Sequence, residues 1–316
     1  MADISLTASM RSNLLSLQQT QSLMDTTQER LSTGKKVNSA IDNPSSYYTA
    51  QSLTNRASDL SSLLDSMGQA VQTIQAANEG IEAITEFASQ AKAIANSAND
   101  TSDVDSIENY MKQFDEILEQ IDGIAKDSGY KGVNLLEKDQ ELKVVFNEDR
   151  SSSLTVKSDD ASSEGLGLHA ATGAWTSEAE KGNATEFKTN GKADAGAYVF
   201  NGDKVYEVKK NYDGTTNAVD FNTLVADGSL VETDYKLNDD KSKAIEVTIS
   251  KDKINTSITE VEDAVSKLRN MASVFGNNYS IVENREEFTE NLINVLEEGA
   301  DKLTLADMNE ESANML

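Results

Sequence analysis

The chain has 316 residues, of which 38% are hydrophobic and 6% aromatic, and its formal net charge is −26. Such a charge would be repelled by backbone phosphates, which argues against a nucleic-acid partner. The absence of cysteine excludes disulfides and thiolate catalysis. No apolar run reaches the length of a membrane span. The start MADISLTASM lacks the regions of a signal peptide, so a secreted chain would need dedicated export machinery.

Residues 4–33 are predicted to form an amphipathic helix that ends at Gly34. Its stripe follows four-three spacing and consists of Met10, Leu14, Leu17, Gln21, Met24, Gln28 and Leu31. Because two of these positions are glutamine, the helix is too weakly apolar to be stable alone, and we predict that it is an assembly surface. Residues 1–40 carry four basic and three acidic side chains, a net of +1, which suits burial against copies of the same segment. The alternative is that the acidic surface only keeps the chain in solution and that the N-terminus is disordered.

Two further helices are predicted after a turn-rich connector at residues 38–46. The first has a seam of Leu60, Leu64, Met67, Val71, Ile74, Ile81 and Ala88, interrupted by Asn78. Residues 99–103 break it, and Asp103 or Ser106 is expected to cap the next helix. That helix carries Ile107, Met111, Phe114, Leu118, Ile121 and Ala125 at the same spacing. These seams are predicted to form the core of the subunit itself.

The period changes at about residue 139. Residues 141–146 and 154–157 flank a polar turn and are predicted to form a hairpin. Further strands are predicted at Ala197–Phe200, Lys204–Val208, Ala218–Phe221 and Ile245–Ile249, with a tight turn at residues 201–203. Helix resumes near Asp252, with Gly276 and Gly299 as candidate breaks. Its seam is the most regular of the chain and consists of Ile254, Ile258, Val261, Val265, Leu268, Ala272, Phe275, Tyr279 and Val282.

The predicted fold is mainly α with a β-rich insertion: a long antiparallel helical bundle or coiled coil built from the N- and C-terminal segments. We expect four parts. Residues 1–40 form an N-terminal core helix, 41–160 a helical rod with the hairpin, 161–250 a variable surface-exposed β domain, and 251–316 the returning helix with the start of a C-terminal core segment.

Several motifs resemble those of bacterial flagellins, the subunits of the flagellar filament. They cover roughly residues 1–160 and 250–316. They consist of residues 30–40 (RLSTGKKVNSA), residues 53–57 (LTNRA), residues 96–99 (NSAN) and residues 129–136 (GYKGVNLL). The stretch at residues 41–48 (IDNPSSYY) looks like a variant of the commoner family sequence. Residues 165–245 match no family pattern.

The resemblance implies a structural, non-enzymatic subunit that polymerises into an extracellular filament for motility. It also implies a helical homo-oligomer, export through the flagellar export apparatus with a chaperone, and contacts with cap and junction proteins. A flagellin normally continues beyond Leu316 with a further helix that pairs with residues 4–33, so the chain as given is expected to polymerise poorly. Alternatives are a hook–filament junction protein, or a secreted adhesin or binding module acting through the middle domain.

The residues expected at the assembly interface are Met10, Leu14, Leu17, Met24, Arg30, Leu31, Gly34, Asn38 and Arg56. Arg30 and Arg56 are either ordinary surface charges or members of inter-helix or inter-subunit ion pairs. Some flagellins are sensed by an animal receptor through an arginine-centred patch. The resemblance aligns that patch with Ser89, Lys92 and Ala93, and because the arginine is missing, sensing is expected to be weak or absent.

No catalytic, cofactor or metal site is predicted. His169 is the only histidine and lies in a glycine-rich stretch, where a solvated loop residue is the expected reading. The His-Glu-x-x-His motif of an inserted metalloprotease is missing. Asp103, Asp105 and the pair Asp239-Asp240 do not follow the spacing of a dedicated calcium site.

Overall fold

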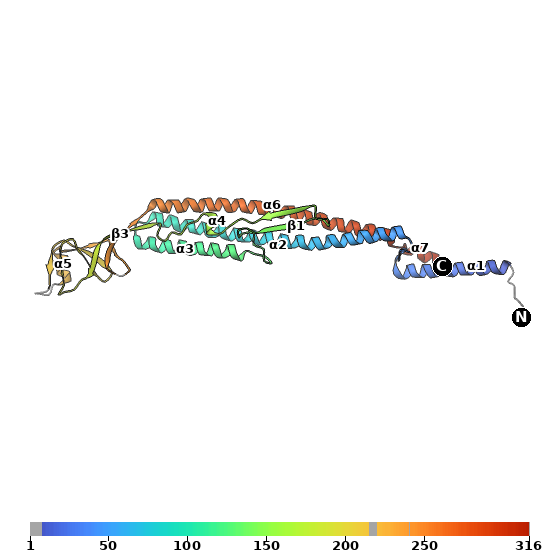
Figure 1. Cartoon of the computed structure of the whole chain (residues 1–316), viewed down its shortest axis with the longest axis horizontal. Coiled ribbons are helices and arrows are strands. Elements are labelled where there is room, and N and C mark those ends of the chain that lie inside the picture. Colours follow the sequence, from blue (N-terminus) through green and yellow to red (C-terminus); the bar gives the residue numbers. More distant parts are fainter. Residues whose placement is uncertain (1–7, 215–219, 240, 316) are drawn as a thin grey trace. The chain divides into compact units, whose positions relative to one another are not determined.

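A computed structural model describes residues 8–214, 220–239 and 241–315 (Figure 1). The helices are α1 (Ala8–Thr33), α2 (Pro44–Asp100), α3 (Val104–Asp127), α4 (Ser163–Leu166), α5 (Phe221–Ala226), α6 (Lys251–Thr304) and α7 (Met308–Met315). The strands are β1 (Glu141–Val145), β2 (Ser153–Lys157), β3 (Thr176–Glu186), β4 (Lys192–Ala193), β5 (Tyr198–Asn201), β6 (Lys204–Val208), β7 (Tyr212–Asp213), β8 (Leu230–Thr233), β9 (Lys236–Leu237) and β10 (Lys243–Ile249). The chain divides into two compact units. The first unit comprises residues 1–75, 141–157 and 275–316, and the second comprises residues 76–140 and 158–274.

The first unit joins both ends of the chain. It holds α1, the beginning of α2, the β1–β2 hairpin, the end of α6 and α7. Ala57 and Leu60 of α2 are buried with Leu296 of α6, which makes a small core between helices more than 200 residues apart in sequence. The predicted association of the N- and C-terminal segments is therefore confirmed within this unit.

Helix α2 begins with a favourable terminus. Pro44 occupies its first position, where the missing N–H costs no hydrogen bond. The Oδ1 atom of Asn43 accepts a hydrogen bond of 3.1 Å from the backbone N–H of Ser46 and thereby caps the helix. The predicted connector at residues 38–46 was therefore too long, because its last three residues are helical.

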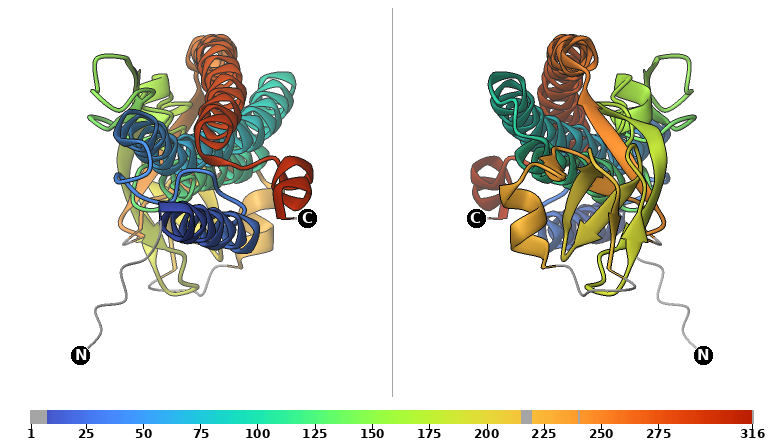
Figure 2. Two further views of the ribbon diagram at one scale, coloured as in Figure 1. Left: turned by 90° about the vertical axis from the view of Figure 1, so that its right-hand side faces the viewer. Right: turned by 90° about the vertical axis from the view of Figure 1, so that its left-hand side faces the viewer.

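The second unit contains a bundle in which the rest of α2, α3 and the beginning of α6 run side by side (Figures 1 and 2). Asp103 caps α3 by accepting from the backbone N–H of Ser106 at 3.0 Å, which confirms one of the two predicted caps. Every residue of the predicted α3 seam is buried. The Phe114 ring of this seam lies 5.1 Å from the ring of the fully buried Trp175.

The predicted seams of α2 and α6 are confirmed in part. Leu64 of α2 and Ile258, Val265, Ala272 and Tyr279 of α6 are only half-buried, while Ser257, Ala264 and Met271 of α6 are buried without having been predicted. Met67, Ile74, Ile81 and Ala88 of α2 are at most 2% exposed, and so are Ile254, Val261, Leu268, Phe275 and Val282 of α6. The candidate breaks in α6 were wrong, because this helix continues through Gly276 and Gly299 as one element of 54 residues. Burial of the seam outweighs the cost of two glycines in a helix, which is about 1 kcal/mol each.

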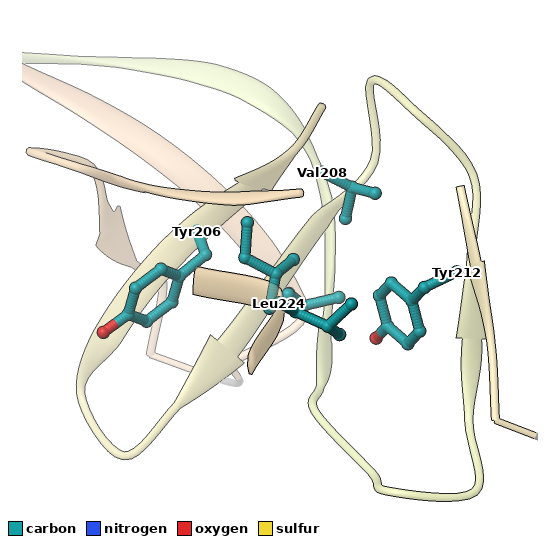
Figure 3. Packing of buried hydrophobic residues seen from close by; sticks show 6 residues of the cluster. Tyr206, Val208, Tyr212 and Leu224 are labelled. Atoms are coloured by element: carbon teal, nitrogen blue, oxygen red, sulfur yellow. The ribbon is translucent and has the colours of Figure 1, made fainter. Parts of the chain in front are cut away.

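The β-rich insertion belongs to the second unit. Its six-stranded sheet has the order β8-β6-β5-β3-β10-β9, in which only the β3–β5 pair is parallel. Helix α5 lies beside this sheet (Figure 2, right). Its Leu224 packs with Tyr206, Val208 and Tyr212 in a cluster of buried residues (Figure 3). The insertion therefore has a core of its own.

Most predicted strands are confirmed, including the hairpin β1–β2 and the tight turn between β5 and β6. The strand predicted at Ala218–Phe221 was wrong for its described part. Asp220 caps α5 by accepting from the N–H of Thr223 at 3.0 Å, and Phe221 is the first helical residue. Residues 218 and 219 lie outside the described residues. Strand β3, which the sequence did not predict, is the longest of the sheet.

Candidate assembly surface

Helix α1 presents an exposed apolar stripe. Among the predicted interface residues, Met10 is 54% exposed, Leu14 50%, Leu17 70% and Met24 41%. Leu15 and Leu23 are exposed as well. Leu15 and Leu23 lie on the opposite side of the helix, but the four residues of the stripe share one face, and such a row marks an interaction site.

Helix α7 packs against α1, and Thr27 of α1 is 4% exposed. Arg30 of α1 donates from Nη1 to Oε1 of Glu311 at 2.9 Å. Glu311 is 6% exposed, and its other oxygen, Oε2, is buried without a hydrogen-bond partner among the described residues. Arg30 thus forms an ion pair between two helices, which is one of the two roles that the sequence left open for it. The neighbouring Leu31 is half-buried.

The segment after α1 pairs with the segment after α6. Gly34 adopts a left-handed conformation with φ of 72°, which ends α1 as predicted. Its carbonyl oxygen accepts from the N–H of Ala306 at 2.9 Å. The N–H groups of Lys36 and Val37 donate to the carbonyl oxygen of Thr304 at 2.8 and 3.2 Å. These backbone contacts fix the exit of α1 against the end of α6.

Asn38 belongs to a turn organised by Asp42. The carboxylate of Asp42 accepts from the backbone N–H groups of Asn38 and Ser39, each at 2.9 Å. These hydrogen bonds, with that of Ser39 the larger cause, hold the pKa of Asp42 below its ordinary value of 3.8. The amide of Asn38 donates to Thr33 Oγ1 at 3.0 Å, and Ile41 at the tip of the turn is 92% exposed.

Arg56 contacts the hairpin. Its Nε donates to Oε1 of Glu148, in the loop between β1 and β2, at 2.5 Å. Both side chains remain partly exposed, so the pair positions the hairpin loop on α2 more than it stabilises the fold. The predicted interface residues therefore fall into three groups. Met10, Leu14, Leu17 and Met24 form the exposed stripe of α1. Arg30, Leu31, Gly34 and Asn38 lie at the end of α1 and in the segment after it, and Arg56 contacts the hairpin loop.

The residues aligned with the receptor patch lie on α2. Ser89 Oγ donates to the carbonyl oxygen of Thr85 at 2.9 Å, a bond within its own helix. Lys92 forms an ion pair of 2.7 Å with Glu262 of α6, and Ala93 is exposed. The cation at this patch is thus engaged with a carboxylate of the same chain.

The described residues hold no cluster of three or more side chains suited to a metal ion. His169 lies 3.1 Å from Glu260 and is 77% exposed. Asp105 pairs with Lys236, while Asp103 serves as the helix cap. In the part of the chain that the structure describes, no helix is long and apolar enough to cross a membrane.

Two partners in this surface were not predicted, namely Glu311 and Thr304. The sequence gives no signal for a backbone carbonyl such as that of Thr304. Glu311 is one of 54 acidic residues, and no periodicity distinguishes it from the solvated ones.

Residues 4–141 match the family model described as the bacterial flagellin N-terminal helical region. Flagellin FljK of Caulobacter vibrioides is 32% identical over 157 residues, covering 49% of this chain and 57% of that protein. Flagellin C of Rhizobium meliloti is 22% identical over 92% of this chain and 84% of its own length. The crystal structure of Bacillus cereus flagellin aligns with 70% of this chain and 86% of its own, at 12% identity and a TM-score of 0.39.

The family model covers α1, the connector after it and α2, which carry part of the surface described above. Over its N-terminal helical region the chain is thus similar to bacterial flagellins. It spans somewhat under two thirds of the length of the Caulobacter relatives that it matches.

Proposed function

We propose that the chain is a structural subunit that polymerises into the bacterial flagellar filament and so supports motility. The observation that carries the proposal is the exposed apolar stripe of α1 in a chain of flagellin sequence. An exposed row of leucines and methionines is costly in water, and burial against other copies removes that cost. Repetition of one such heterologous contact generates a helical assembly.

The proposal includes further elements that follow from the family. The subunit is not an enzyme, it is secreted through the flagellar export apparatus with an export chaperone, and it contacts cap and junction proteins at the ends of the filament. The partner of the α1 stripe is another terminal helix of the assembly. The degenerate patch at Ser89, Lys92 and Ala93 predicts weak or absent sensing by an animal flagellin receptor, because Lys92 is paired with Glu262.

The test uses two matched substitutions on α1. Leu17→Asp places a charge on the stripe, whereas Gln19→Asp places the same charge at another exposed position of the same helix. Both variants should fold, since neither side chain is buried. Sedimentation and electron microscopy compare the amount of polymer that the three proteins form, which should be similar for the unmodified chain and Gln19→Asp and at least tenfold lower for Leu17→Asp. Equal filament yield from all three would contradict the role of the stripe.

A further inference from the structure

The turn at residues 38–43 presents an unusual apolar tip. Ile41 is 92% exposed, the largest value among the exposed large hydrophobic side chains that the structure describes. The turn beneath it is held by three hydrogen bonds to one carboxylate oxygen of Asp42, from the N–H groups of Asn38 and Ser39 and from the Ser39 hydroxyl. A preformed turn loses little conformational entropy on binding, which makes Ile41 suitable as an anchor side chain.

The first unit also carries a pocket of about 250 Å³ where α2, the hairpin loop and α6 meet. Its apolar lining consists of Leu60, Phe146, Phe288 and Leu292. Of these four residues Phe288 is the most exposed, at 58%. A cavity of about 150 Å³ can hold benzene, so this pocket has room for the four-carbon side chain of isoleucine.

We propose that Ile41 of one chain inserts into this pocket on a second copy of the same chain; the proposal rests on the function proposed above and names a lateral contact for it. Ile41 and the pocket of its own chain are too far apart to meet. Sixteen residues of α2 separate Pro44 from Leu60, which is about 24 Å of helix. The three residues from Ile41 to Pro44 span at most about 11 Å.

Charge at the two surfaces favours a second copy as the occupant. The charged residues that line the pocket are Arg56, Arg285 and Glu148. Arg56 is paired with Glu148, whereas Arg285 has no ion pair among the described residues and lies 5.3 Å above the Phe146 ring. The residues that line the pocket therefore carry a net charge of +1, in a chain whose net charge is −26. The residue that follows Ile41 is the anionic Asp42, which is opposite in charge to the unpaired Arg285 of the pocket lining.

The two surfaces are different from each other, so the contact is heterologous. Each copy offers one tip and one pocket, and a contact of this kind repeats from copy to copy without closing into a dimer. This geometry suits a filament and would add a contact outside the terminal helices.

The absence of cysteine allows a direct test. The full chain with Ile41→Cys is mixed with the ¹⁵N-labelled chain with Phe288→Cys under mild oxidation, and disulfide-linked heterodimers are counted by mass spectrometry. The matched control replaces Phe288→Cys with Val295→Cys, which is similarly exposed at 63% and lies seven residues further along α6, outside the pocket. We expect heterodimers to form at least tenfold faster with Phe288→Cys. Equal rates, or none with either, would overturn the contact.

A second variant separates this contact from the proposed function. Ile41→Asp alters only a solvated side chain and should fold normally. We expect it to raise the concentration needed for filament formation at least tenfold. If it leaves that concentration unchanged, the contact is wrong and the filament function stands. If the unmodified chain forms no filaments but the disulfide remains selective for Phe288→Cys, the contact stands and the proposed function fails.

Discussion

The guanidinium of Arg30 lies 2.9 Å from the carboxylate of Glu311, although 281 residues separate them in sequence. Arg30 is 37% exposed at its side chain, whereas the side chain of Glu311 is 8% exposed. The pair therefore serves mainly to neutralise a buried carboxylate where α7 meets α1. The contact makes the last turn of α1 depend on a helix from the other end of the chain.

Arg30→Ala should loosen α7, because Glu311 would stay buried without its cation at a cost of about 2 kcal/mol. Hydrogen exchange should become at least tenfold faster in Met308–Met315. Arg11→Ala, which removes an exposed cation from the same helix, is the control and should leave these amides unchanged. Unaltered exchange in the Arg30 variant would mean that backbone contacts alone hold α7.

The β-rich insertion should be removable. Thr176 of β3 and Ile249 of β10 are paired across the ladder, and the N–H of Ser250 donates to the carbonyl oxygen of Trp175 at 2.8 Å. Replacing residues 177–248 with a two-residue Asn-Gly turn should therefore preserve the α2–α3–α6 bundle. The ion pairs of Lys236 with Asp105 and Glu108 are lost, but partly exposed pairs contribute about 1 kcal/mol or less each.

Thermal unfolding followed by circular dichroism should give a Tm for the shortened chain within a few degrees of the parent's value. A deletion that begins at Ala171 instead removes Trp175 and should destabilise the bundle strongly. Asp115 accepts from the N–H groups of Ala171 and Thr172, so that longer deletion also leaves a carboxylate of α3 without its partners. If both deletions unfold alike, the insertion is part of the bundle's folding unit.

Ser257→Ala should destabilise the second unit by about 1–3 kcal/mol. The Nε1–H group of Trp175 donates to Ser257 Oγ at 3.0 Å, and both residues are buried, so the substitution leaves a donor without a partner. Trp175 is the only tryptophan, and its fluorescence reports chemical denaturation of this site. Thr256→Ala, on the exposed side of the same helix, should change the free energy of unfolding by less than about 0.5 kcal/mol.

The stability of the turn that carries Ile41 should change with pH only under acidic conditions. The hydrogen bonds from Ser39 and Asn38 lower the pKa of Asp42 in the folded chain below its ordinary value of 3.8. A lowered carboxyl pKa stabilises the turn above pH 3.8, and this stabilisation is lost as the pH falls through the lower folded value. NMR titration of the Asn38 and Ser39 amides should show a midpoint below 3.8 that disappears in Asp42→Asn. A midpoint above 3.8 would contradict the hydrogen-bonded turn.

The helical part of the fold was predictable because its information is local and repeated. Seams such as that of α3 place one apolar side chain per turn, and their burial follows from periodicity alone. Caps were predictable at Asp103 for the same reason. The break predicted at Gly276 was wrong, because packing of the long α6 seam outweighs the low helix propensity of one glycine.

The insertion was less predictable because its pairing is not local. Strand β3 is polar on both faces, with Ala184 as its single buried residue, so it lacks the alternation that indicates a strand. It forms because β10, about 65 residues later, and β5 supply its partners. The segment after Asp220 differs from β3, because a local signal decides its structure. Asp220 caps α5, so a helix begins where the composition had suggested a strand. The sequence indicated the apolar stripe of α1, but it did not indicate that Glu311 is the partner of Arg30.

Helix α6 carries a second apolar row one residue before its buried row. Val274, Ile281, Phe288 and Val295 follow at seven-residue intervals and are 38–63% exposed. On a straight α-helix such a repeat drifts by about 20° per heptad, so the row turns through about 60° from its first member to its last. A straight neighbouring element could not stay in register with all four side chains. A neighbour must either wrap around α6 with a left-handed sense or meet the row at one position, as a single isoleucine at Phe288 would.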